Sequence, residues 1–271
     1  LNNRGEFISE KVGQEVLKKA QSAKFEFAEV DKLGQVTSKD YLDYHIEKIL
    51  ALPYVNVAAI KAKRYKVALD AVNSVGGIAV PKLLKALGVD EIFELYCEPT
   101  GKFAHNPEPL PENISHLASE VKQYKADIGI AVDPDVDRLA LIDEKGEPFG
   151  EEYTLVAVAD YVLSQVKGNT VSNLSSTKAL KDITIKHGQQ YFTSAVGEVN
   201  VVEKMKEVKA VIGGEGNGGV ILPELHYGRD ALVGIALFLS HLATSNKSVH
   251  ALRAQYPNYV ISKNKIQLED G

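Results

Sequence analysis

Apolar and polar positions alternate with two different periods along this chain of 271 residues. Short apolar runs, which are typical of buried strands, are followed by stretches with apolar residues three or four positions apart, which are typical of helices. In the first half, the pattern predicts helices at residues 10–22, 41–50, 78–87 and 114–124 and strands at residues 65–72, 90–97 and 126–132. Strand and helix therefore alternate, as they do in an α/β layer.

The second half of the chain repeats this alternation. Helices are predicted at residues 153–166, 178–187, 199–206 and 231–243. Strands are predicted at residues 169–176 and 189–196 and on both sides of a glycine-rich loop at residues 213–219. The chain is therefore expected to contain two consecutive α/β units.

Composition and charge place the chain among ordinary globular proteins. Hydrophobic residues make up 45% of the chain and charged residues 25%, and this length is enough to bury a sizeable core. The net charge is −5, and no run of Lys and Arg is interleaved with aromatic residues. Nucleic acid is therefore not an expected partner, because nothing provides a broad attraction to a phosphate backbone.

Cysteine usage and hydropathy indicate where the protein works. Cys97 is the only cysteine, which excludes an internal disulfide and a cysteine-rich metal site and is compatible with a reducing cytosol. No apolar stretch reaches the roughly 20 residues that a membrane helix needs, and the N-terminus has no signal-peptide pattern. We therefore expect a cytoplasmic protein without a membrane partner.

Three aspartates directly follow the strand predicted at residues 126–132. Asp133, Asp135 and Asp137 alternate along a loop at its carboxyl end, which is where open α/β sheets hold ligands. Three neighbouring carboxylates repel one another unless a cation lies between them, and hard oxygen ligands of this density suit Mg²⁺. Arg138 follows at once, so that a phosphate oxygen could be shared between its guanidinium and the metal.

Two other interpretations of this loop remain open. Asp is common in turns because its side chain caps backbone groups, so the loop could be a plain turn. A phosphatase could use Asp133 as nucleophile and Asp135 as general acid, although a convincing downstream Lys and acidic metal motif are missing. Three aspartates and an arginine between two strongly apolar runs favour the metal site.

A second candidate lies in the glycine-rich loop at residues 213–219. Glu215 and Asn217 are spaced by one residue, so a turn would present both side chains in the same direction. A carboxylate and an amide placed in this way can bond neighbouring hydroxyls, as sugar recognition requires. A mobile hairpin between two strands is an equally good interpretation of the glycines alone.

The remaining polar clusters predict structure rather than chemistry. The sequence "NSVGG" at residues 73–77 lacks the Lys and the Ser or Thr of a phosphate-binding P-loop, which favours a structural turn. Four histidines show no metal-ligand spacing and are expected at the surface or in packing roles: His105, His187, His226 and His241.

Five motifs, in this order along nearly the whole chain, resemble those of the α-D-phosphohexomutase superfamily: "VALDAVNSVGG", "EPTGKFAHNPEPLPEN", "GIAVDPDVDR", "SAVGEVNVVEKM", and "GGEGNGG" followed by "GRDAL". The resemblance implies two consecutive α/β three-layer sandwich domains. The metal-binding domain would cover residues 39–154 and the sugar-recognition domain residues 155–258. Residues 1–38 would be the remnant of a first domain, and residues 259–271 a linker towards a C-terminal domain.

The same resemblance implies an intramolecular phosphotransferase, an isomerase that interconverts hexose 6-phosphate and hexose 1-phosphate. The reaction would pass through a phosphoserine and a bisphosphorylated sugar. Asp133, Asp135 and Asp137 would hold Mg²⁺, and Arg138 would assist the phosphoryl group. Glu215 and Asn217 would hold the hydroxyls of the sugar.

The family's phosphoserine loop, Ser-His-Asn-Pro, would lie just before Leu1, and its last domain should begin after Tyr259. The expected partners are therefore a hexose phosphate and the missing N- and C-terminal domains of the same polypeptide. The 271 residues alone are expected to fold without mutase turnover. A module that binds Mg²⁺ but performs no phosphoryl chemistry is the corresponding alternative.

Departures from the family pattern bear on the substrate. Glu198 stands in "VGE" where phosphomannomutase/phosphoglucomutase members have His, and the sugar loop has Asn217 and Gly219 where many have Ser and His. An acidic residue here resembles the "VGD" of phosphoglucosamine mutases, and a carboxylate would favour a cationic 2-amino group. Glucosamine phosphate is therefore the expected substrate, with mannose or glucose phosphate as the alternative.

Overall fold

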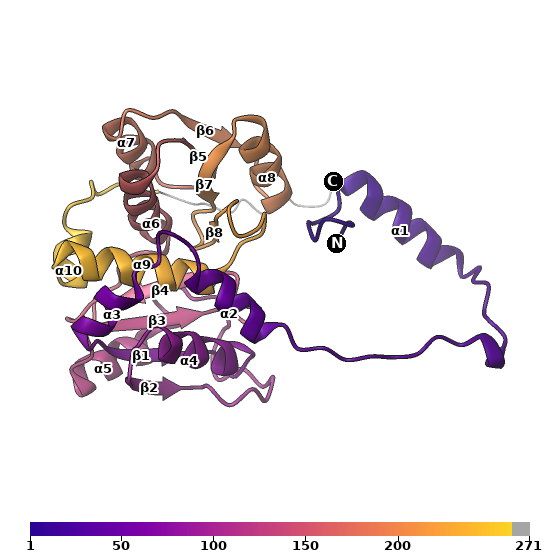
Figure 1. Ribbon diagram of the computed structural model, residues 1–271, viewed down its shortest axis with the longest axis horizontal. Coiled ribbons are helices and arrows are strands. Elements are labelled where there is room, and N and C mark those ends of the chain that lie inside the picture. The colour runs from indigo at the N-terminus through magenta and orange to yellow at the C-terminus, as the bar shows by residue number, and fades with distance from the viewer. Residues whose placement is uncertain (262–271) are drawn as a thin grey trace, which may run out of the picture.

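A computed structural model describes residues 1–261. Most of this range forms two α/β units, each built on a four-stranded sheet (Figure 1). The strands of the first sheet are β1 (Lys66–Asp70), β2 (Glu91–Leu95), β3 (Ile128–Val132) and β4 (Leu139–Ile142). Those of the second are β5 (Asn169–Asn173), β6 (Tyr191–Ser194), β7 (Ala210–Gly214) and β8 (Val220–Ile221). The predicted α/β class with two units is confirmed.

Both sheets have the same topology. The strand orders are β2-β1-β3-β4 and β6-β5-β7-β8, and in each sheet the fourth strand alone runs antiparallel. Parallel neighbours end at the same edge of a sheet, so the segments that follow β1, β2 and β3 lie beside one another. The sequence therefore brings the 71–77 turn, the long 96–114 loop and the aspartate loop to one edge.

Helices cover both faces of each sheet, which gives each unit three layers. The first unit uses α2 (Leu42–Leu50), α3 (Val57–Lys63), α4 (Gly76–Ala86) and α5 (Ser115–Tyr124). The second uses α6 (Glu151–Gln165), α7 (Ala179–Lys186), α8 (Glu198–Glu207) and α9 (Ala231–Ser245), and the short α10 (Val249–Arg253) follows. The helix α3 and the helix α10 were not predicted.

Helix α9 belongs to the cores of both units. It is apolar on all sides and buried almost throughout its length, and it lies between the two sheets (Figure 1). It packs against α2, α3 and α4 of the first unit and against α6 and β8 of the second. A helix that is hydrophobic all round is stable only when other elements cover every side, and here the two units do so together.

The turn at residues 73–77 shows how closely the first sheet's edge is packed. Gly77 is the second residue of α4 and lies beside the loop that follows β2, where a Cβ atom would overlap the backbone carbonyl of Cys97. Only glycine allows this close approach of two backbones. The turn thus fixes the distance between α4 and the 96–114 loop.

Helix α1 (Glu10–Ser22) and the chain between it and α2 stand apart from both sheets (Figure 1). Helix α1 has the predicted bounds, but none of its residues is buried. A short 3₁₀ helix, η1 (Val30–Lys32), follows it before the chain reaches α2. A linker is expected at residues 259–271, and residues 262–271 of it lie outside the described residues. No helix within residues 1–261 combines the length and the apolar character required to span a bilayer.

Candidate functional site

The three aspartates of the loop after β3 converge. Asp133, Asp135 and Asp137 each offer a carboxylate oxygen, and these oxygens all lie within 4.8 Å of one another. The Oδ1 atom of Asp133 accepts hydrogen bonds from the backbone N–H groups of Asp137 and Arg138, both at 3.0 Å, which closes the loop. Val136 adopts a φ of 61°, which is unfavourable for a β-branched residue and indicates that the surroundings impose the loop's shape.

The electrostatics of this loop fit a bound cation. Burial raises the pKa of Asp133, and burial together with the Asp133 carboxylate raises the pKa of Asp137 to about 7. Within the described part of the chain, the buried Oδ1 atom of Asp137 has no hydrogen-bond partner. Repelling carboxylates with an unbonded oxygen form a donor set that suits a hard divalent cation.

Arg138 lies against the aspartate loop and connects it to the long loop after β2. Its Nη1 atom forms an ion pair with Glu108. Its Nε atom lies 3.5 Å from Oδ2 of Asp133 and 3.6 Å from Oδ1 of Asp137. The guanidinium therefore lies beside the carboxylates. An anion bound to a cation in the aspartate loop would be within reach of its N–H donors.

The glycine-rich loop of the second sheet touches the aspartate loop directly. The backbone N–H of Leu139 donates to the carbonyl of Gly218 at 3.1 Å, and Arg138 and Gly219 form an antiparallel bridge. Gly218 has a φ of 89°, and a Cβ atom there would overlap the backbone of Leu139. The two loops that were predicted separately from the sequence thus form one continuous surface.

Within the glycine-rich loop, the two predicted side chains lie in different environments. Glu215 is buried, and its Oε1 atom accepts hydrogen bonds from Nδ2 of Asn173 at 2.7 Å and from the backbone N–H of Gly197 at 3.3 Å. Asn217 uses its side-chain oxygen to accept the N–H of Gly219 at 3.2 Å, which stabilises the turn. Glu215 therefore ties the loop to two further segments, whereas Asn217 shapes the loop itself.

Arg229 is the residue that the sequence did not single out. Its Nε donates to Oε2 of Glu198 and its Nη1 to Oε2 of Glu215, both at 3.0 Å, and its Nη2 pairs with Oδ2 of Asp137. Its backbone N–H also donates to Oε1 of Glu198 at 3.0 Å. One guanidinium therefore joins the aspartate loop of the first unit to two carboxylates of the second unit. The "GRDAL" motif was visible in the sequence, but Asp137 lies 92 residues before Arg229.

Glu198 faces Arg229 rather than open space. Both of its carboxylate oxygens bond to Arg229, and its side chain is 9% exposed. A cavity of about 690 Å³ opens beside these two residues and is bounded on its other side by Phe7, Ile8 and Ser9. The sequence analysis predicted Glu198 as a substrate contact but did not foresee that its carboxylate engages Arg229.

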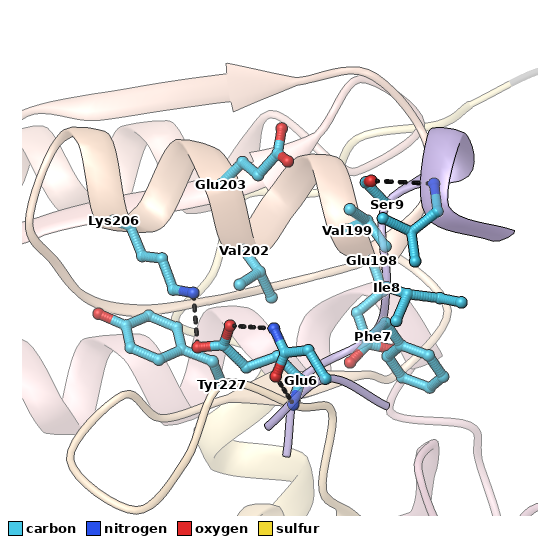
Figure 2. A pocket seen from close by; sticks show the side chains of 12 residues that line it. Glu6, Phe7, Ile8, Ser9, Glu198, Val199, Val202, Glu203, Lys206 and Tyr227 are labelled. Carbon is cyan, nitrogen blue, oxygen red and sulfur yellow. Dashed lines mark hydrogen bonds and ion pairs between the residues drawn. The ribbon is translucent and has the colours of Figure 1, made fainter. Parts of the chain in front are cut away.

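Residues 6–9, which precede α1, lie along α8. Figure 2 shows a neighbouring pocket of about 290 Å³ in which residues 6–9 lie across the side chains of α8. Lys206 on α8 forms an ion pair with Glu6 at 2.6 Å. Residues 6–9 thus lie next to the candidate site although α1 stands away from both sheets.

Comparison with known proteins identifies the family. The model of "Phosphoglucomutase/phosphomannomutase, alpha/beta/alpha domain II" matches residues 40–146, and the model of domain III of the same family matches residues 150–259. The chain belongs to the phosphoglucomutase/phosphomannomutase family. The two matched regions of the chain correspond to domains II and III of that family.

Relatives of this family carry several mutase names. The chain is 34% identical over 250 residues to the phosphoglucomutase/phosphomannomutase of Thermococcus kodakarensis, which covers 92% of this chain and 54% of that protein. It is 33% identical over 224 residues to the phosphoglucosamine/phosphogalactosamine mutase of Sulfurisphaera tokodaii, covering 81% and 49%. The chain thus spans about half the length of the curated relatives it matches.

Solved structures of the family share the fold. A phosphoglucomutase/phosphomannomutase family protein from Burkholderia thailandensis matches with a TM-score of 0.80 at 30% identity, over 93% of this chain and 54% of that one. N-acetylphosphoglucosamine mutase of Aspergillus fumigatus, solved with GlcNAc-6P and magnesium, matches with a TM-score of 0.57 at 14% identity, over 80% and 49%. The second likeness is one of fold alone.

Replacing Arg229 with Met should destabilise the protein, because three largely buried carboxylates lose their shared counter-charge. We expect the free energy of unfolding to fall by about 3 kcal/mol, the cost of breaking a buried ion pair. The loss should be greater at pH 8 than at pH 6, because Asp137 becomes protonated below its pKa of about 7. Urea unfolding without divalent cations measures both values. Arg4→Met changes an exposed arginine and is the control; an equal effect of the two substitutions would contradict the role given to Arg229.

Proposed function

We propose that this chain supplies the metal-binding and sugar-binding parts of a phosphohexomutase. Such an enzyme interconverts hexose 6-phosphate and hexose 1-phosphate through a phosphoserine and a bisphosphorylated sugar. The observation that carries the proposal is the junction of the two loops through Arg229 and the Gly218–Leu139 hydrogen bond, in a chain of this family. Mutase turnover is proposed for the whole protein, since its relatives are about twice as long.

In this proposal, residues 39–154 form the metal-binding domain and residues 155–258 the sugar-recognition domain. Asp133, Asp135 and Asp137 would hold Mg²⁺, which supplies charge neutralisation at a transferring phosphoryl group. The unbonded oxygen of Asp137 and its raised pKa support this assignment. The magnesium in the complex of the Aspergillus mutase, which shares the fold, agrees with it.

Arginine side chains would position the phosphoryl group. Arg138 would turn from Glu108 towards a phosphate oxygen, for which its planar guanidinium offers parallel N–H donors. Arg229 would hold Asp137 and Glu215 at a fixed distance from each other. A sugar bound by Glu215 and Asn217 would then present its phosphate to the aspartate loop. Catalysis of this kind is largely positioning and electrostatics.

The environment of Asp133 argues against a phosphatase that uses it as nucleophile. Its side chain is 6% exposed, and its Oδ1 atom is already held by two backbone N–H groups. A nucleophile needs a free oxygen aligned with the phosphorus atom. A ligand role agrees better with these contacts.

We propose glucosamine phosphate as the substrate. Asp137, Glu198 and Glu215 surround one arginine, so the cluster carries an excess of negative charge when all three carboxylates are ionised. A cationic 2-amino group would be attracted to it more strongly than the neutral 2-hydroxyl of glucose or mannose. The phosphoglucosamine mutases among the relatives support this choice.

Substitution of Asp135 with Asn should weaken Mg²⁺ binding at least about tenfold, because an exposed ligand is removed without disturbing the core. Isothermal titration of the 271-residue chain measures the affinity. The affinity of the unmodified chain should also fall about tenfold from pH 8 to pH 6, because protons compete for Asp137, whose pKa is raised to about 7.

Asp90→Asn, at an exposed position outside the loop, is the matched control and should leave the affinity unchanged. An Asp135 variant that binds Mg²⁺ as tightly as this control would refute the metal site. An affinity that stays constant between pH 6 and pH 8 would refute the assignment of Asp137 as a ligand.

Substitution of Glu198 with Gln should selectively weaken the binding of glucosamine 6-phosphate. Removing one carboxylate near a cationic amine is expected to cost about 1 kcal/mol, or about fivefold in affinity, while glucose 6-phosphate should be little affected. Titration of both sugars in the presence of Mg²⁺ gives the ratio. Glu207→Gln, at an exposed position on the same helix that lines neither pocket, is the control; equal losses for the two sugars in the Glu198 variant would count against glucosamine.

A further inference from the structure

Two histidines and a buried aspartate form a cluster outside the aspartate loop. His45 on α2 and His226 and Asp230, which lie between β8 and α9, each offer one ligand atom within 4.8 Å of the others. The Nε2 atoms of His45 and His226 lie 2.8 Å and 3.1 Å from the same atom, Oδ2 of Asp230. Sequence spacing could not reveal the cluster, because His45 and Asp230 are 185 residues apart.

The position of the aspartate is fixed by the backbone. Asp230 is the N-cap of α9, and its Oδ1 atom accepts the N–H groups of Leu232 at 2.8 Å and Val233 at 3.1 Å. The carboxylate cannot rotate without breaking both bonds. Its second oxygen therefore stays directed at the two imidazole rings.

The buried carboxylate of Asp230 requires a positive partner. Arg229 is its neighbour in sequence, but that guanidinium is shared by Asp137, Glu198 and Glu215. The N-terminus of α9 stabilises Oδ1, and the imidazole side is where a counter-charge for Oδ2 is available, from protonated rings or from a cation between them.

The geometry accommodates a small metal ion. Tetrahedral Zn²⁺ holds its nitrogen and oxygen ligands about 3.3 Å from one another, given bond lengths of about 2.0–2.2 Å. The two observed separations would have to open by a few tenths of an ångström. The imidazole side chains are 32% and 43% exposed, so they have room to shift. A pocket of about 350 Å³ lies beside both rings and leaves space for water as a further ligand.

We propose that His45, His226 and Asp230 form a binding site for Zn²⁺ or a similar first-row transition metal. Imidazole nitrogens favour these metals, whereas the all-oxygen aspartate loop favours Mg²⁺, so the two sites take different ions. The metal joins α2 of the first unit to the start of α9. It thereby fixes the segment that carries Arg229.

Zinc titration of the untagged 271-residue chain in excess Mg²⁺ tests the site. One Zn²⁺ should bind, and the double variant His45→Gln/His226→Gln should bind it at least about tenfold more weakly. His250→Gln is the matched control: this histidine also bonds an aspartate, Asp143 at 2.8 Å, but is not part of the cluster. It should leave zinc affinity unchanged.

X-ray absorption at the zinc edge of the unmodified chain gives a result that does not depend on whether the variants fold. Two imidazole ligands and oxygen in the remaining positions are expected. The proposal is overturned if no stoichiometric zinc binds, if the absorption spectrum shows fewer than two imidazoles, or if the double variant and the His250 variant retain equal affinity.

Discussion

The shared ion pairs of Arg229 hold the two halves of the candidate site together. Asp137, Glu198 and Glu215 come from three separate segments and two sheets, and each would be poorly solvated without this guanidinium. Arginine suits the position because its planar fork of N–H donors can serve several carboxylates at once. The start of α9 fixes the arginine in turn, since Asp230 beside it caps that helix.

Burial and mutual repulsion govern the aspartate loop beside this arginine. Burial raises the pKa of Asp133, and burial together with the Asp133 carboxylate raises that of Asp137 although Arg229 lowers it. The strained backbone at Val136 and the unbonded oxygen on Asp137 are costs that the surrounding contacts must offset. The same loop is bonded to the glycine-rich loop through Gly218, which holds the two loops at a fixed distance.

Local patterns were sufficient to predict most of the secondary structure and the position of the aspartate loop, because strand and helix periods and closely spaced aspartates are properties of short segments. The helix α3 was missed because only Ile60 among its seven residues is buried, so it has almost no apolar period. Arg229 and the engagement of Glu198 were missed for a different reason. Their contacts depend on how two units pack around α9, and nothing in a single sequence relates positions 92 residues apart.

The most direct test of the account is the mutual dependence of metal and sugar binding in the 271-residue chain. If the two loops form one site, Mg²⁺ should tighten the binding of a hexose 1,6-bisphosphate, and the bisphosphate should tighten Mg²⁺ binding by the same factor. Amide NMR signals of residues 133–138 and 213–219 should shift together on addition of the sugar. Independent affinities, with shifts confined to one loop, would contradict the account.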